Sequence, residues 1–248
     1  KNCEEERLLG VSITGIMDNP LTNGKKGDLD SLLKELKERA IKTNAKIAKE
    51  IGIPQSAAIT CVKPSGTVSQ LVDAASGIHA RHNPYYIRTV RGDKKDPLTQ
   101  MMVDAGFPVE DDMMNPGHTS VFSFPMKAPD HAVFRTDMTA IEQMDLVRKL
   151  QKVWADNAIS VTVYYKMEEL DGIKEYLAEN WHEMKSVSFL LHSEHGFDQA
   201  PMGELTLDEY NEMLNKTKEL GERLSGSTIM SEDDMALMGE SCDTGACP

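Results

Sequence analysis

The sequence has few cysteines, no long apolar stretch and too few basic residues to balance its carboxylates. Four cysteines among 248 residues exclude a small disulfide-rich scaffold and suit a reducing compartment. No apolar run reaches the length of about 20 residues that a transmembrane helix needs. The charged start, residues 1–7, is unlike a signal peptide. We therefore predict a cytoplasmic protein that makes no contact with membranes.

The shortage of positive charge limits the partners that the chain can bind. It has 40 acidic and 27 basic residues, a formal net charge of −13. Binding to a nucleic-acid backbone depends on clustered Lys and Arg, so the composition argues against a nucleic-acid partner. Small anions remain possible ligands at a local basic site or at a helix end. Because a strand-like run begins almost directly after Lys1, we expect the chain to be a segment of a larger protein.

Apolar periodicity predicts alternating strands and helices along the chain. A chain of this length with 40% hydrophobic residues can bury a core of ordinary size. Alternation of helices with continuous apolar strands predicts an α/β protein with a largely parallel sheet or barrel. We expect this globular segment over residues 1–224 and a flexible tail over 225–248. The expected strands are 8–16, 57–62, 120–126, 159–165 and 187–191, and the expected helices are 30–50, 98–105, 139–156, 167–181 and 207–224.

The tail carries two cysteines, Cys242 and Cys247, separated by four residues in polar surroundings. Gly245 and Asp243 supply the bend that a small disulfide ring needs. An exposed pair of this kind predicts a redox-active dithiol on a flexible arm. Half of a metal site and two incidental cysteines are the alternatives. Zinc would need two further ligands, and none is near in the sequence, so we predict no metal site.

The second strand leads into Pro64-Ser-Gly-Thr-Val-Ser69, a turn with hydroxyl groups and a glycine that permits close backbone approach. Free N–H groups at the start of a helix bind phosphate well. The alternative is an ordinary helix N-cap, for which Ser and Thr are preferred. The spacing of a Walker loop is absent. Lys63 could add charge, although a lysine beside a proline is more often simply solvated.

Residues 76–91 form the basic cluster of this acidic chain, with three arginines and two histidines. The cluster could hold a nucleotide or a corrinoid. It could equally be a surface loop with solvated arginines and packed tyrosine rings. His79 and His82 have a spacing that metal sites use, but Pro84 and the lack of a third ligand argue against a metal.

Several motifs in fixed order resemble the ribonucleotide reductases. The resemblance is closest to the adenosylcobalamin-dependent class, and within it to the monomeric ribonucleoside-triphosphate reductases, and it covers nearly the whole chain. The segments that carry it are 7–15, 62–70, 77–91, 138–143, 157–162, 187–190, 199–201 and the terminal Cys-x4-Cys.

The resemblance implies conversion of ribonucleoside triphosphates, or diphosphates, to 2'-deoxyribonucleotides by radical chemistry. It implies that Cys242 and Cys247 re-reduce an active-site disulfide and are recharged by a thioredoxin or glutaredoxin-type reductant. The strands would belong to the C-terminal part of a ten-stranded α/β barrel. The residues that would bind the substrate's phosphates are Pro64, Ser65, Gly66, Thr67, Val68 and Ser69.

The sequence also departs from this family. The thiyl-radical cysteine lies in a finger loop of the form Asn-x-Cys-x-Glu, and this chain has none. Cys3 has Glu5 at the right offset, but Lys1 stands where asparagine is required. We therefore expect a C-terminal segment that is inactive without an N-terminal part. Adjacent tyrosines of the iron-dependent class are missing from 187–192, which favours adenosylcobalamin as the radical source.

Two rival functions remain open at this stage. One is a nucleotide-binding fragment without catalysis, which the missing finger loop permits. The other is a thiol–disulfide oxidoreductase that acts through the tail alone.

Overall fold

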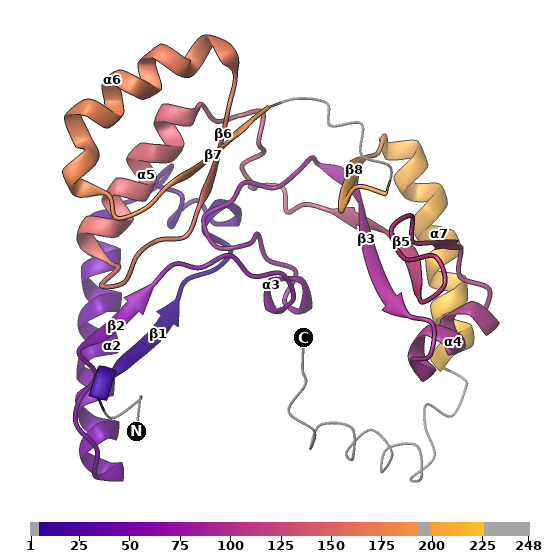
Figure 1. Ribbon diagram of the computed structural model, residues 1–248, viewed down its shortest axis with the longest axis horizontal. Helices are drawn as coiled ribbons and strands as arrows, with labels where there is room; N and C mark the ends of the chain where they lie inside the picture. The colour runs from indigo at the N-terminus through magenta and orange to yellow at the C-terminus, as the bar shows by residue number, and fades with distance from the viewer. Residues whose placement is uncertain (1–4, 193–198, 226–248) are drawn as a thin grey trace. The chain divides into compact units, whose positions relative to one another are not determined.

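The computed structural model describes residues 5–192 and 199–225, which divide into two compact units (Figure 1). Unit 1 draws on Lys1–Pro84 and Ala128–His195, and unit 2 on Tyr85–Lys127 and Gly196–Pro248. The sequence predicted one segment over residues 1–224, and the structure distinguishes two units within it. Of the predicted tail, only Ser225 is described.

Unit 1 is built on parallel strands. Strand β1 (Leu8–Ser12) pairs with β2 (Ala58–Cys61), and β6 (Thr162–Tyr165) pairs with β7 (Ser188–Leu191). They form two two-stranded sheets, and an isolated parallel bridge between Val62, just after β2, and Ile159, before β6, connects them. The predicted parallel α/β arrangement is confirmed for this unit, although its described residues do not form a closed barrel.

Capping residues close in the sequence determine where the two long helices of unit 1 begin. The Asp28 carboxylate accepts the Ser31 N–H at 3.2 Å and caps α2 (Leu29–Ile51), which ends at Gly52 with φ 72°. A reciprocal capping box between Thr139 and Glu142 starts α5 (Ala140–Val153). These predicted helices are confirmed. The others are α3 (Val68–Leu71), α6 (Leu170–Asn180) and the 3-10 turns η1 (Ile16–Asp18), η2 (Met167–Glu169) and η3 (Trp181–Glu183).

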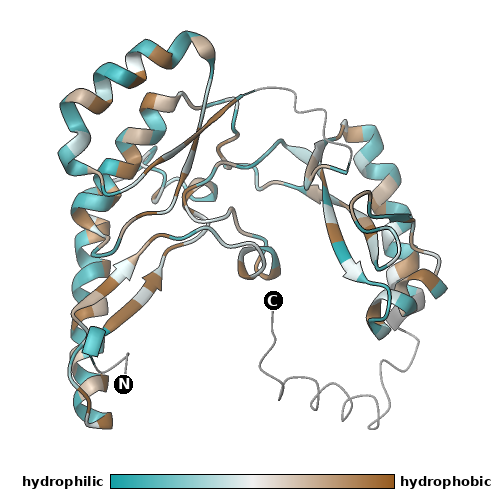
Figure 2. Ribbon diagram, in the orientation of Figure 1, coloured by the Kyte–Doolittle hydropathy of each residue, from teal (hydrophilic) through white to brown (hydrophobic). Residues whose placement is uncertain are grey.

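The core of unit 1 combines both of its chain segments. Figure 2 shows hydrophobic residues along β1, whereas α2 and α6 mix hydrophobic and hydrophilic residues. The buried indole of Trp154 donates to the Cys61 carbonyl at 2.8 Å, so the end of α5 is fixed to β2. The core residues that are almost fully buried are Ile16, Met17, Leu33, Val62, Ile78, Val133, Ala140, Met144, Val147, Leu150, Ile159 and Val163.

Unit 2 is an antiparallel sheet, which corrects the prediction of a largely parallel one for this part of the chain. Its strand order is β4-β5-β3-β8. Antiparallel sheets can leave one face in water, so the polar and basic residues of β3 concealed a strand. The strands are β3 (Tyr85–Asp93), β4 (Val109–Asp111), β5 (Thr119–Lys127) and β8 (Met202–Glu204), and the helices are α4 (Pro97–Asp104) and α7 (Leu207–Ser225).

A buried ion pair ties together the loops of unit 1. Arg81, 4% exposed, donates through Nε and Nη2 to the two carboxylate oxygens of Asp18, at 2.9 and 2.8 Å. Its Nη1 lies 3.1 Å from the Asp73 carboxylate, and the Ala75 N–H donates to Asp18 at 2.6 Å. Because Asp18 ends η1, the pair holds this turn against residues 73–75.

Replacing Arg81 with methionine is expected to lower the free energy of unfolding by about 3–5 kcal/mol, because the Asp18 carboxylate, 12% exposed, would lose its partner. Urea unfolding followed by tryptophan fluorescence measures this, since Trp154 and Trp181 both lie in unit 1. Lys42→Met is the control, because its pair with Glu38 is 77% and 69% exposed and should contribute little. Equal stabilities of the two variants would contradict the assignment.

Candidate functional site

The segment Pro64–Ser69, the 64–69 loop, leaves the end of β2 and is held by its own serines. The Ser65 N–H donates to Ser76 Oγ at 2.7 Å, and the Ser69 N–H donates to Ser65 Oγ at 2.9 Å. The Ser69 hydroxyl in turn donates to the Ser65 carbonyl at 2.7 Å. These bonds close the loop into a fixed turn that continues into the first residues of α3.

The outer part of the 64–69 loop presents backbone N–H groups to solvent. Gly66, Thr67 and Val68 are exposed, and their N–H groups have no hydrogen-bond partner among the described residues. Open space surrounds the position of a Cβ on Gly66. Successive free N–H groups in a turn can donate to an anion. Since α3 has only four residues, its dipole adds little, and the capacity to bind an anion depends on the loop itself.

The six predicted phosphate-binding residues therefore differ in what they can contact. Ser69 is fully buried with its hydroxyl engaged, so it shapes the turn and its side chain cannot reach a ligand. Ser65 is partly buried and keeps a hydroxyl proton to donate. Lys63 is exposed, and its Nζ donates to Ser160 Oγ at 3.0 Å, so its charge lies beside β6.

Close backbone packing fixes the turn that supports the 64–69 loop. Gly77 has φ 55°, and a Cβ there would lie 2.7 Å from the Lys63 carbonyl oxygen. Only glycine fits this left-handed position beside another backbone. The Ser76–Gly77 turn thus lies directly against the start of the loop.

A cavity of about 220 Å³ adjoins the 64–69 loop at Pro64. His79 lines it, and both of its ring nitrogens are engaged: the Thr162 N–H lies 3.1 Å from Nε2, and Nδ1 lies 3.0 Å from the Ser76 carbonyl. Burial lowers the pKa of His79 below its ordinary value of 6.5. The other lining residues are uncharged: Ser160, Val161, Thr162, Ser186, Val187 and Ser188.

The basic cluster predicted over residues 76–91 is divided by the structure. The boundary between the two units falls between Pro84 and Tyr85, so the cluster contributes to both. The Arg81 guanidinium is engaged in its buried ion pair with Asp18. In unit 2, Arg91 Nε lies 2.7 Å from an Asp112 carboxylate oxygen. The Arg91 side chain, through its hydrogen bond, lowers the pKa of Asp112. These two arginines serve the fold of their own units.

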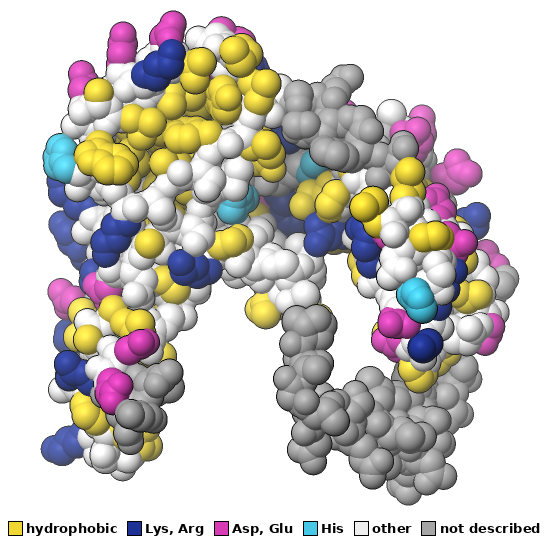
Figure 3. Space-filling model, in the orientation of Figure 1, with side chains coloured by type: hydrophobic (Ala, Val, Ile, Leu, Met, Phe, Trp, Pro, Cys, Tyr) yellow, Lys and Arg dark blue, Asp and Glu magenta, His cyan; other side chains and the backbone are white. Residues whose placement is uncertain are grey.

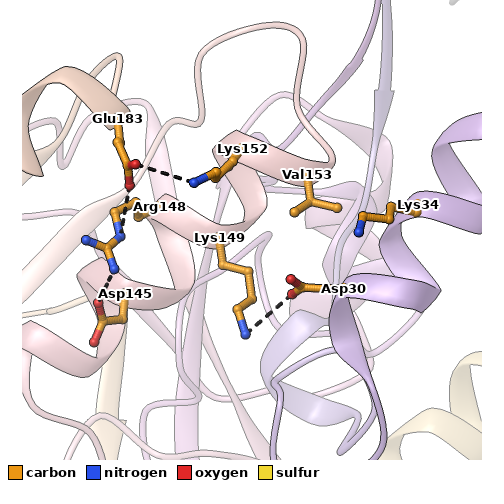
Figure 4. A pocket seen from close by; sticks show the side chains of 8 residues that line it. All are labelled: Asp30, Lys34, Asp145, Arg148, Lys149, Lys152, Val153 and Glu183. Carbon is orange, nitrogen blue, oxygen red and sulfur yellow. Dashed lines mark hydrogen bonds and ion pairs between the residues drawn. The ribbon is translucent and has the colours of Figure 1, made fainter.

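A charged hollow of about 470 Å³ between α2, α5 and η3 is a weaker candidate (Figure 4). Lys149 lies 3.4 Å from Asp30, and Glu183 lies 3.3 Å from Arg148 and 3.5 Å from Lys152. Its cations are thus largely neutralised by carboxylates, which would also repel an anion. The ion pairs of the hollow therefore link α2 to α5 and α5 to η3, and the 64–69 loop is the better anion site.

Other predicted features fall partly outside the described residues. Cys3, Cys242 and Cys247 lie outside the described residues. Cys61 is described and is buried at the end of β2. The described residues contain no group of three or more His, Cys, Asp or Glu that could hold a metal ion. None of the helices in the described part of the chain has the length and apolar character to cross a membrane.

Comparison with known proteins identifies relatives over almost the whole chain, although no family model matches. The adenosylcobalamin-dependent ribonucleoside-triphosphate reductase of Euglena gracilis is 31% identical over 244 residues, covering 97% of this chain and 33% of that protein. The Lactobacillus gasseri enzyme of the same name is 30% identical over 277 residues, covering 100% and 37%. A probable enzyme of this kind from Dictyostelium discoideum is 31% identical over 252 residues, covering 97% and 32%.

The fold agrees with these relatives. A crystal structure of a B12-dependent, class II ribonucleotide reductase matches 93% of this chain and 36% of its own, with a TM-score of 0.76 and 24% identity. The chain spans about a third of the length of the curated relatives that it matches. The resemblance predicted from the sequence is confirmed: the chain is homologous to the adenosylcobalamin-dependent, class II ribonucleoside-triphosphate reductases.

Proposed function

We propose that this chain is the part of a class II ribonucleotide reductase that supplies the substrate-phosphate loop and the C-terminal dithiol. The whole enzyme would convert ribonucleoside triphosphates, or diphosphates, to 2'-deoxyribonucleotides. The observation that carries the proposal is similarity along nearly the entire chain to a third of such enzymes. The free N–H groups of the 64–69 loop supply a site that suits this substrate.

The substrate's phosphates would lie against the exposed part of the 64–69 loop. The N–H groups of Gly66, Thr67 and Val68 can donate to phosphate oxygens, and the Ser65 and Thr67 hydroxyls are further donors. Each bond to a charged oxygen contributes about 1.5–3 kcal/mol. Because the chain carries a net charge of −13, local donors and not a general positive field must supply this affinity.

The dithiol would deliver the electrons that each turnover consumes. The thiolate of one cysteine, Cys242 or Cys247, attacks the oxidised active-site disulfide, and the second thiol resolves the mixed disulfide. The active-site pair gains two electrons and two protons, and the tail leaves as a disulfide. A thioredoxin or glutaredoxin-type protein would then restore the tail.

The remaining two thirds of the enzyme would cover apolar surface that unit 1 exposes. Within the described residues β1 pairs only with β2, and Leu8, Leu9 and Val11 are 61%, 41% and 39% exposed. An apolar hollow of about 570 Å³ lies between β1 and α2, and Figure 3 shows hydrophobic side chains gathered over β6, β7 and α6. Parallel sheets are normally covered on both faces. We therefore infer that an N-terminal part completes a ten-stranded barrel here.

Adenosylcobalamin is the proposed cofactor because the relatives depend on it by name. When bound, it would supply the radical that starts the reaction. His79 is not available as a cobalt ligand, because both of its ring nitrogens are engaged. We assign no residue of this chain to the corrinoid.

Replacing Gly66 with valine is expected to weaken binding of a ribonucleoside triphosphate roughly 10-fold to 100-fold, the equivalent of about 1.5–3 kcal/mol. The new side chain would occupy the space that phosphate needs, while meeting no neighbour in the fold. Ser65→Ala should also weaken binding, because Ser65 Oγ accepts the Ser69 N–H that closes the loop.

Calorimetric titration of both variants measures this effect. Gly172→Val is the matched control, since Gly172 on α6 also has nothing near a Cβ position. Equal affinities for parent, Gly66→Val and Ser65→Ala would refute the phosphate assignment.

Cys242 and Cys247 are expected to form an intramolecular disulfide that thioredoxin opens readily, whereas Cys3 and Cys61 stay out of it. Cys61 is buried, so a second thiol cannot reach it without unfolding. Mass spectrometry after alkylation in graded redox buffers identifies the pair. Retention of a metal ion with both tail thiols protected would point to a structural site instead.

Deoxynucleotide formation is expected only when the chain is mixed with the N-terminal part and adenosylcobalamin, and iron should not replace the cofactor. Truncation after Glu240 should abolish multiple turnovers with a thioredoxin system but allow a single turnover of pre-reduced enzyme. The assay measures product formed per enzyme for the chain, the mixture and the truncated mixture.

Three outcomes of that assay would favour other functions. Product from the chain alone, or without cobalamin, would overturn the proposal. Nucleotide binding without turnover in any mixture would favour a binding fragment. Disulfide reductase activity that needs no nucleotide would favour a thiol–disulfide oxidoreductase.

A further inference from the structure

We infer that His79 is a positioning residue that holds the 64–69 loop against β6 in its neutral form, so that protonation of its ring releases the loop and weakens phosphate binding. The inference rests on the proposed function, because it assigns a ligand to that loop. It goes further because it names His79 as the residue that fixes the loop's position and acid as the condition that loosens the loop.

The ring's partners determine its tautomer. The Thr162 backbone can only donate through its N–H, so Nε2 must accept and carries no proton. The Ser76 carbonyl can only accept, so Nδ1 carries the proton and donates to it. A neutral Nδ1–H imidazole satisfies both contacts, and a doubly protonated ring cannot.

These contacts continue directly into the candidate site. Ser76, which receives the Nδ1–H bond on its carbonyl, accepts the Ser65 N–H on its hydroxyl oxygen at 2.7 Å. Ser65 then accepts the Ser69 N–H at 2.9 Å. An unbroken series of hydrogen bonds thus runs from the backbone of β6 through the imidazole to the 64–69 loop. A displacement of His79 would reach the loop through Ser76.

Protonation must break the first link of this series. A cationic ring presents N–H groups at both positions, so Nε2–H would face the Thr162 N–H, and the two donors would repel each other. The cavity around the ring adds no carboxylate that could stabilise the cation. Its other lining residues are uncharged. They come from Pro64, from 160–162 before and at the start of β6, and from 186–188 before and at the start of β7. Lys63, which donates to Ser160 Oγ, brings positive charge to the same neighbourhood.

The lowered pKa of His79 agrees in sign with this geometry. The unfolded chain takes up the proton near the ordinary value of 6.5, whereas the folded chain resists it to lower pH. The stabilisation from the neutral ring is therefore complete above that value and is lost as the pH falls towards the lowered pKa. Loosening of the loop is expected in this acidic range.

The test uses the 248-residue chain and two variants. His79→Gln keeps an amide that can donate to Ser76 and accept from Thr162 but does not titrate, and His79→Ala removes both bonds. Hydrogen exchange followed by NMR, corrected for intrinsic rates, reports the Thr162, Ser65 and Ser69 amides between about pH 5 and pH 8. Titration with a ribonucleoside triphosphate over the same range reports affinity.

In the parent, acid should reduce protection of these three amides and affinity together by about tenfold, as loss of one such hydrogen bond implies. His79→Gln should lack this acid step, and His79→Ala should show the weakened state at every pH. Identical pH responses in parent and His79→Gln, with normal protection in His79→Ala, would overturn the inference. Loss of loop protection without nucleotide binding by any form would sustain the positioning role and refute the proposed function alone.

Discussion

The buried guanidinium of Arg81 is the contact on which the arrangement of unit 1 around the 64–69 loop depends. It forms a two-point bond with Asp18 and also reaches Asp73, whose backbone is left-handed at φ 44°. The next residue, Ala74, donates its N–H to the Ser69 carbonyl at 2.8 Å. An unpaired charge in this position would cost several kcal/mol, so η1, the 73–75 segment and the end of the loop keep one geometry.

Capping residues and apolar periodicity predicted the helices whose ends are fixed by residues close together in the sequence. The caps of α2 and the Thr139–Glu142 capping box involve residues only a few positions apart, and those helices are confirmed. The partner of Arg81 lies 63 residues away at Asp18, and no periodicity reveals such a pair. Strands β3, β4 and β8 were missed because β3 is half exposed and the other two have three residues each.

The residues of the candidate site could be predicted from the sequence. Which of them can contact a ligand and which only shape the loop could not. The motif Pro64-Ser-Gly-Thr indicated an anion loop, and its open N–H groups agree with that function. Sequence alone treated Ser69 as a contact residue, whereas its burial makes it part of the scaffold. His79 was considered within a basic cluster, because its neutral, doubly bonded state depends on Thr162 and becomes visible only in three dimensions.

The order of strands in unit 1 has a consequence for how the chain folds. Lys63 and Ser160 meet although 97 residues separate them, and β3, β4 and β5 of unit 2 lie in that interval. Bringing such distant segments together carries a loop-closure entropy that local contacts do not. During synthesis β1 and β2 would emerge well before β6, leaving apolar strands without cover. Pairing of β3, β4 and β5 in the interval would shorten the effective loop and so assist closure of unit 1.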